Sequence, residues 1–134
     1  MIAIDSSVLI DLLGEDRMAG AAETTLREAL TRGRVTVCDV VVAEVCSSFG
    51  KGSEVMKVIE DMGVHYSAVT RESAVRAGEM QKQYRERGGR RVRSVPDFIV
   101  GAHAMLQCKG LITRDDGFFH DYFKGLTIIV PKAT

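Results

Sequence analysis

The sequence predicts an α/β fold, in which a single domain over residues 1–134 forms a three-layer α/β/α sandwich around a mostly parallel sheet of about five strands. Short apolar segments alternate with longer segments of helical periodicity along the whole chain. The short segments are apolar on both faces, as buried parallel strands are. A length of 134 residues suits one domain, and neither an internal repeat nor an interdomain linker interrupts the pattern.

Local signals place each element. The predicted strands are short and apolar, at residues 1–4, 34–38, 64–69, 111–113 and 126–130. The predicted helices cover residues 6–13, 17–32, 39–49, 53–63, 70–89, 96–110 and 117–123. Asp39 and Thr70 are predicted N-caps, Pro96 suits a first helical turn, and Gly33 and Gly110 are predicted to end helices.

Composition favours a globular protein outside the membrane. Apolar residues make up 46% of the chain and charged residues 27%, and no apolar run approaches the roughly 20 residues that span a bilayer. The N-terminus lacks a basic segment before its apolar stretch, so no signal peptide is expected. Cys38, Cys46 and Cys108 form no CxxC pair and are expected to be reduced, which favours the cytoplasm.

One segment is strongly basic although the formal net charge is zero. Residues 82–93, KQYRERGGRRVR, contain one lysine and five arginines against a single glutamate. A solvated helix end followed by a loop explains this pattern without any ligand. Alternatively, the segment contacts phosphates, because guanidinium groups match phosphate oxygens, and Arg90 and Arg91 are the candidate substrate contacts.

Four acidic residues interrupt apolar surroundings. Asp5 and Asp115 each follow a predicted strand, Asp97 lies in the first turn of a helix, and Glu44 lies inside the apolar segment VVAEV. None has a basic partner at helical spacing. Each also has a structural explanation, since Asp5 and Asp115 are able to cap helices, Asp97 to stabilise a helix dipole and Glu44 to reach solvent.

The four acids are expected to meet if the first and fourth strands are neighbours, because sites form at the carboxyl ends of parallel strands. Two carboxylates about 4 Å apart repel by about 4 kcal/mol at an effective dielectric constant of about 20, so such a cluster needs a cation. Oxygen ligands without histidine or thiolate favour Mg²⁺ or Mn²⁺ over zinc. His103, in GAHAM, is expected to be a packed core residue rather than a ligand.

The segments DSSVLIDLL, VVAEV, PDFIVGAHA and LITRDDGFF resemble, in order and spacing, the four acidic motifs of the PIN domain, especially of VapC-type toxin ribonucleases. The resemblance implies that Asp5, Glu44, Asp97 and Asp115 are the catalytic acids and that Asp5 and Asp97 are metal ligands. Ser6 replaces a commoner threonine and Gly101 a usual alanine. Asp116 is not a family position, and Gly117 replaces an acid that some members carry.

The resemblance implies a metal-dependent endoribonuclease that uses Mg²⁺ or Mn²⁺, the toxin of a type II toxin–antitoxin pair. Its expected partners are an RNA substrate, a small antitoxin protein and a second copy of the chain in a homodimer, and no membrane. Ser6 and Thr113 join Arg90 and Arg91 as candidate substrate contacts. Glu44 or Asp115 is expected to orient the attacking water or to act as general base.

Two other functions remain open from the residues alone. A non-catalytic PIN-like module would bind only a protein partner, although such modules usually lack one or more of the acids, and all four are present. A phosphatase with Asp5 as nucleophile would need a second aspartate two residues later, where Ser7 stands. Neither GxGxxG nor a P-loop is present, which argues against a nucleotide cofactor.

Overall fold

The computed structural model describes residues 1–88 and 93–132. Within these residues the chain forms five strands, all short: β1 (Ile2–Ile4), β2 (Val35–Val37), β3 (Val64–Tyr66), β4 (Gly110–Ile112) and β5 (Thr127–Ile129). The described helices are α1 (Ser6–Gly14), α2 (Ala19–Arg32), α3 (Asp39–Ser48), α4 (Gly52–Asp61), α5 (Arg71–Glu86), α6 (Val95–Gln107) and α7 (Asp116–Tyr122). Every predicted strand and helix is therefore confirmed, with shifts of a few residues at the ends.

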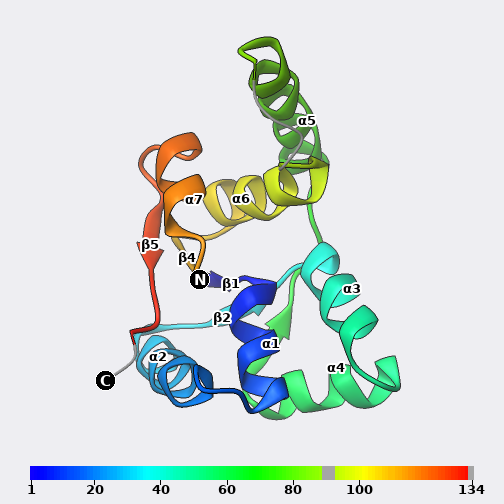
Figure 1. Cartoon of the computed structure of the whole chain (residues 1–134), viewed down its shortest axis with the longest axis vertical. Helices are drawn as coiled ribbons and strands as arrows, with labels where there is room; N and C mark the ends of the chain where they lie inside the picture. The colour runs from blue at the N-terminus through cyan, green and yellow to red at the C-terminus, as the bar shows by residue number, and fades with distance from the viewer. Residues whose placement is uncertain (89–92, 133–134) are drawn as a thin grey trace.

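The sheet is parallel throughout, with strand order β3-β2-β1-β4-β5. The first strand thus lies at the centre, between β2 and β4, and Ile4 stands beside Ile112 in register. Right-handed crossovers put α1–α4 on one face and α5–α7 on the other. Figure 1 shows this arrangement, with α1, α2 and α4 on one side of the strands, α6 and α7 on the other, and α5 projecting beyond α6. The predicted α/β sandwich is confirmed.

The core lies between the sheet and the helices on its two faces. All residues of β2 and β4 are buried, which explains why these strands are apolar apart from Thr36 of β2. On the α6 side, Phe98 and Phe123 are completely or almost completely buried within a cluster of aromatic rings. His103 is also buried, as predicted, and its Nε2 lies 3.0 Å from the hydroxyl of Ser67.

Two predicted helix limits are corrected. Gly110 does not end α6, which stops at Gln107, but begins β4, where an added Cβ would lie 3.1 Å from the carbonyl oxygen of Thr127. Asp39 is the first residue of α3 rather than its N-cap, which is Cys38. Thr70 is the N-cap of α5, as predicted, and its hydroxyl accepts the backbone N–H of Ser73.

The three cysteines are free thiols. Cys38 is buried, and burial raises the pKa of its thiol to about 11. No helix in residues 1–88 and 93–132 is both long and apolar enough to cross a membrane.

Candidate active site

The candidate site lies where the order of strand addition in the sheet reverses. The chain runs outward from β1 to β2 and β3 and then returns to β4 on the other side of β1. In such sheets a crevice forms beyond the carboxyl ends of the two strands at the switch point. Asp5 directly follows β1 and Thr113 directly follows β4. The predicted adjacency of the first and fourth strands is confirmed, and it brings these two residues together.

Asp5 both caps a helix and belongs to the site. It is the N-cap of α1, and its Oδ1 accepts the backbone N–H of Ser6 at 2.8 Å. Its Oδ2 accepts the hydroxyl of Thr113 at 2.7 Å and that of Ser7 at 3.2 Å. The residue is only 8% exposed, and burial raises its pKa while these hydrogen bonds oppose the rise. The charge of Asp115 also raises it, so the two carboxyls share one environment.

Thr113 links Asp5 to Asp115. Its hydroxyl donates to Asp5 and accepts the backbone N–H of Asp115 at 3.0 Å. The residue is completely buried, with both hydrogen-bonding roles of its hydroxyl in use. The structure thus gives Thr113 a positioning role toward two acids, and its predicted substrate contact stays a prediction.

Asp115 has a basic partner that the sequence did not reveal. Nη2 of Arg93 donates to Oδ1 of Asp115 at 3.0 Å, and Nη1 donates to Oδ2. The guanidinium carbon also lies 4.4 Å from the ring centroid of Phe118. The hydrogen bonds that Arg93 donates to Asp115 raise the pKa of Arg93 further above its ordinary value. Because 22 residues separate the two, no pattern of helical spacing could find the pair.

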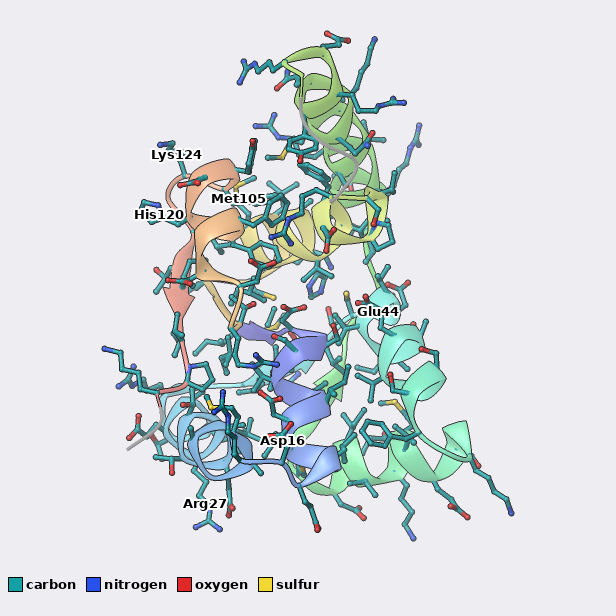
Figure 2. All side chains as sticks on the ribbon, viewed as in Figure 1. Asp16, Arg27, Glu44, Met105, His120 and Lys124 are labelled. Carbon is teal, nitrogen blue, oxygen red and sulfur yellow. The ribbon has the colours of Figure 1, made fainter. Side chains whose placement is uncertain are left out.

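Glu44 and Asp97 complete the acidic set from two helices. Figure 2 shows Glu44 on α3. Although it lies inside an apolar segment of the sequence, the residue is exposed, in agreement with the alternative that its side chain reaches solvent. Partial burial of its carboxyl raises its pKa, as do the charges of Asp5 and Asp97, whereas a hydrogen bond with Ser6 lowers it. Asp97 is half-buried, and its Oδ2 accepts the backbone N–H of Ser94 at 3.1 Å.

The acids influence one another, but they do not form a closed ligand cluster. No group of three or more His, Cys, Asp or Glu side chains within residues 1–88 and 93–132 is placed to hold a metal ion. The four acids were predicted to converge on one crevice; the charges of Asp115, Glu44 and Asp97 do act on one another through Asp5 and Glu44, while Asp97 also bonds the backbone of Ser94 and Asp115 bonds Arg93. The donor chemistry nevertheless fits a hard divalent cation, since carboxylate and hydroxyl oxygens surround Asp5.

A second ion pair connects the segment that follows β4 to α1. Asp11 on α1 is buried, and its Oδ2 lies 2.5 Å from Nε of Arg114, which follows Thr113. The hydroxyl of Ser7 accepts the backbone N–H of Arg114 at 3.3 Å. The segment after β4 is therefore tied to α1 at both Thr113 and Arg114, which fixes the distance between the two strand ends.

A sequence model of the PIN domain family matches residues 2–123. The chain belongs to the PIN domain family. A search of curated protein sequences found no significant relative. Among solved structures, VapBC2 from Rickettsia felis, bound to a DNA fragment from its promoter, matches with a TM-score of 0.75 and 12% identity, covering 98% of this chain and 100% of that one.

Two further solved structures extend the likeness of this PIN domain. VapBC-1 from nontypeable Haemophilus influenzae matches with a TM-score of 0.70 and 16% identity over 96% of each chain. VapC20 from Mycobacterium tuberculosis, described as a toxin that cleaves the sarcin–ricin loop, matches with a TM-score of 0.67 and 18% identity. It covers 95% of this chain and 99% of its own. At these identities the likeness establishes a shared fold.

Gly101, where an alanine is usual in the family, packs against a ring in this PIN domain. An added Cβ would lie 2.2 Å from Cζ of Phe123. The ring of Phe123 thus occupies the space that an alanine methyl would need. Because glycine has no Cβ, this position lets the ring of Phe123 pack directly against α6.

The basic segment divides into parts with different surroundings. Lys82 pairs with Glu86 at 4.0 Å on the exposed face of α5, and Arg93 pairs with Asp115. Arg90 and Arg91 lie outside the described residues, so their predicted substrate contacts stay predictions. Ser6, the remaining candidate contact, interacts with Glu44 and lies at the start of α1.

Proposed function

We propose that this PIN domain is a metal-dependent endoribonuclease and the toxin of a type II toxin–antitoxin pair. The observation that carries the proposal is Asp5, a buried carboxyl at the switch point of a parallel sheet whose pKa is raised by burial and by Asp115. Perturbed acids in a strand-end crevice are typical of catalytic or cation sites. Glu44 and Asp97 add negative potential to the same region.

In this proposal Asp5 and Asp97 hold Mg²⁺ or Mn²⁺. The cation, when bound, would supply positive charge against the phosphate oxygens of the scissile bond. Thr113 and Ser7 keep the carboxylate of Asp5 in one orientation through their hydroxyls. Glu44 is exposed, and its raised pKa makes it a better proton acceptor than an ordinary glutamate, so it is the candidate general base for the attacking water.

Arg93 gives the proposed site a positive group of its own. Its guanidinium neutralises Asp115, so the strand end is not uniformly negative. A phosphate diester approaching the acids would meet this guanidinium, whose fork of donors suits phosphate oxygens. Asp115 would then be released from its partner and become available to orient water or a cation.

The proposed macromolecular partners are RNA and a small antitoxin. A solved structure described as a toxin–antitoxin complex from Klebsiella pneumoniae shares this fold with a TM-score of 0.68, and this similarity supports an antitoxin for the present chain. VapC20 is described as a toxin that cleaves the sarcin–ricin loop, and because that loop is RNA, the description supports an RNA substrate. A homodimer and a cytoplasmic location stay predictions. A short open reading frame beside the gene, encoding a DNA-binding N-terminal segment, would support the antitoxin.

The activity is tested by incubating purified protein with tRNA, rRNA and mRNA pools. We expect cleavage at few sites with Mg²⁺ or Mn²⁺ and none with EDTA. Asp5→Asn should abolish cleavage, whereas Asp116→Asn, which changes an exposed neighbouring acid in the same way, should retain it. Intact RNA in every pool with either metal would refute the nuclease and favour a module that only binds a protein.

A further inference from the structure

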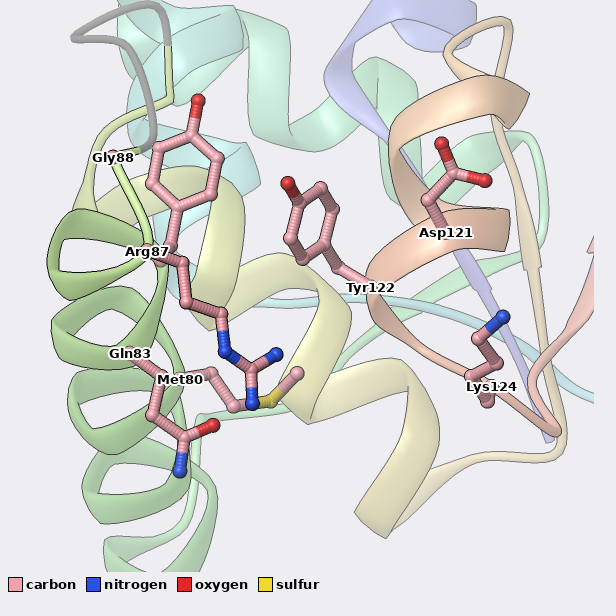
Figure 3. Close-up of a pocket in the computed structure, with 8 residues that line it drawn as sticks. Met80, Gln83, Arg87, Gly88, Asp121, Tyr122 and Lys124 are labelled. Carbon is pink, nitrogen blue, oxygen red and sulfur yellow. The ribbon is translucent and has the colours of Figure 1, made fainter.

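A pocket of about 570 Å³ lies between the C-terminal half of α5 and the end of α7. Figure 3 shows Gln83 and Arg87 of α5 on one side and Asp121, Tyr122 and Lys124 on the other. Its volume lies in the range of sites for small ligands or for one unit of a polymer. None of its lining residues is one of the four acids, so it is a separate site.

The lining of the pocket favours an anion. Arg87 and Lys124 line it from two different segments, and both residues are exposed. Neither has an ion-pair partner within the described part of the chain. Among the lining residues that the structure describes, Asp121 is the one acid. Two cations against one carboxylate leave an excess of positive charge, which attracts phosphate.

The pocket also presents an aromatic surface. Tyr122 is 41% exposed, and its ring centroid lies 5.3 Å from that of Tyr84 and 5.3 Å from that of Phe118. Tyr84 is itself largely buried, so the neighbouring rings hold Tyr122 in place from behind. A fixed aromatic ring beside cationic side chains is the combination that binds bases and phosphates of single-stranded nucleic acids.

The pocket is connected to the candidate active site through one ring. Phe118 contacts Tyr122 on one side and lies 4.4 Å from the guanidinium carbon of Arg93 on another. Arg93 in turn bonds Asp115. Phe118 itself is buried, so the pocket and the candidate active site lie on two sides of one ring, and a chain that crosses the acids at Arg93 would be close to the pocket.

We propose that this pocket binds one nucleotide of a single-stranded RNA, with its base on Tyr122 and its phosphate at Arg87 and Lys124. The inference rests on the proposed function, because it assigns a subsite to the same RNA substrate. An acidic protein segment is the competing occupant, but it would use the two cations and leave the aromatic surface unexplained.

The charge arm of the test measures binding of a short fluorescent single-stranded RNA in EDTA, where no cleavage is expected. We compare wild type, the double variant Arg87→Gln/Lys124→Gln and the control Lys51→Gln/Lys57→Gln. The control removes two exposed lysines of the α4 region and changes the net charge equally. We expect the pocket variant to lose about 10-fold or more in affinity and to show a shallower salt dependence, and the control to lose about 2-fold or less.

The stacking arm uses Tyr122→Leu and Tyr122→Phe. Leucine should lower RNA affinity by about 5-fold or more, whereas phenylalanine keeps the ring and should stay close to wild type. An RNA with abasic positions should bind more weakly than normal RNA to the wild type but not to Tyr122→Leu. Circular dichroism of each variant checks that the fold is retained.

The outcomes are distinct. If wild type, both double variants and both tyrosine variants bind RNA equally well, the pocket is not a nucleotide site, even if the protein cleaves RNA. Weakened binding of a polyglutamate peptide to the pocket variant, with unchanged RNA binding, would likewise overturn it in favour of a protein-docking site. RNA binding that depends on the pocket in a protein without cleavage activity would support the pocket and refute the proposed nuclease instead.

Discussion

Arg93 holds both carboxylate oxygens of Asp115 while its guanidinium lies against the ring of Phe118. The side chain of Arg93 is 26% exposed and that of Asp115 37%, so the pair sits at the mouth of the site rather than in the core. The guanidinium of Arg93 is therefore already paired with Asp115, one of the four acids. Any divalent cation that uses Asp115 has to compete with this guanidinium.

We expect Arg93→Gln to lower the stability of the metal-free protein but to increase the stabilisation that a divalent metal provides. Without metal, loss of the half-exposed ion pair and the ring contact should lower the free energy of unfolding by about 1 kcal/mol. With millimolar Mn²⁺ the variant should gain more stability than wild type, because Asp115 is freed and the site is more negative. Thermal melts in both conditions measure this. Arg85→Gln, an exposed arginine of α5, is the control, and equal Mn²⁺ shifts in all three proteins would contradict the competition.

Thr113→Val should impair the site more than it impairs the fold. Valine keeps the shape but removes the hydroxyl that donates to Asp5 and accepts from the backbone of Asp115. The unpaired groups should cost about 1–3 kcal/mol of stability. Metal binding, followed by calorimetry with Mn²⁺, should weaken as Asp5 loses its fixed orientation. Thr113→Ser keeps the hydroxyl and should restore most of the affinity, and failure of serine to do so would argue against the positioning role.

The pH dependence of stability follows from Asp5 and Glu44. Both carboxyls have raised pKa values in the folded protein, from ordinary values of 3.8 and 4.5, so the folded state binds their protons more tightly than the unfolded state. Their contribution to stability is complete below these ordinary values and is lost as pH rises through the higher folded values. In EDTA, Glu44→Gln should therefore show a smaller loss of unfolding free energy above about pH 4.5 than wild type.

Urea unfolding at a series of pH values measures this contribution. Glu28→Gln, which changes an exposed glutamate on α2, should follow the wild-type curve. Mn²⁺ should flatten the wild-type curve, because the cation favours the ionised carboxyls. A Glu44→Gln profile parallel to wild type in EDTA would show that this carboxyl is not perturbed.

Gly101→Ala should destabilise the protein by about 1–3 kcal/mol, because the new methyl collides with the ring of Phe123. Gly78→Ala is the matched control in the middle of α5. Nothing lies within 4 Å of its added Cβ, so it should stabilise the helix by about 0.5–1 kcal/mol. The double variant Gly101→Ala/Phe123→Leu should recover part of the lost packing compared with additive single effects. Chemical denaturation of wild type, Gly101→Ala, Gly78→Ala, Phe123→Leu and the double variant measures these differences.

The architecture could be predicted because short-range patterns in the sequence indicate the individual strands and helices. β4 is buried on both faces and apolar throughout, β2 is buried and apolar apart from Thr36, and the helices have apolar repeats that locate them along the chain. Gly110 was misplaced because a glycine after a helical pattern indicates a C-cap equally well as a close strand contact. Glycine suits this position because a Cβ would approach the carbonyl oxygen of Thr127, which lies in a strand that begins 17 residues later.

The candidate site was predictable in position but not in detail. Asp5 and Asp115 follow strands, and parallel strands end at the same edge, so the location followed from topology. The partners did not, because Arg93 and Thr113 act across the fold on acids that local sequence cannot connect to them. Asp5 shows that the structural and functional interpretations need not exclude each other, since one carboxylate caps α1 and faces the strand-end crevice.

The central position of β1 has a consequence for how the protein is made. Asp5 and its hydrogen-bond partner Thr113 are separated by 108 positions in the sequence. Until β4 has been synthesised, β1 has a neighbouring strand only on its β2 side. The strand-end site therefore cannot form on a nascent chain before the residues of β4 and Thr113 have left the ribosome.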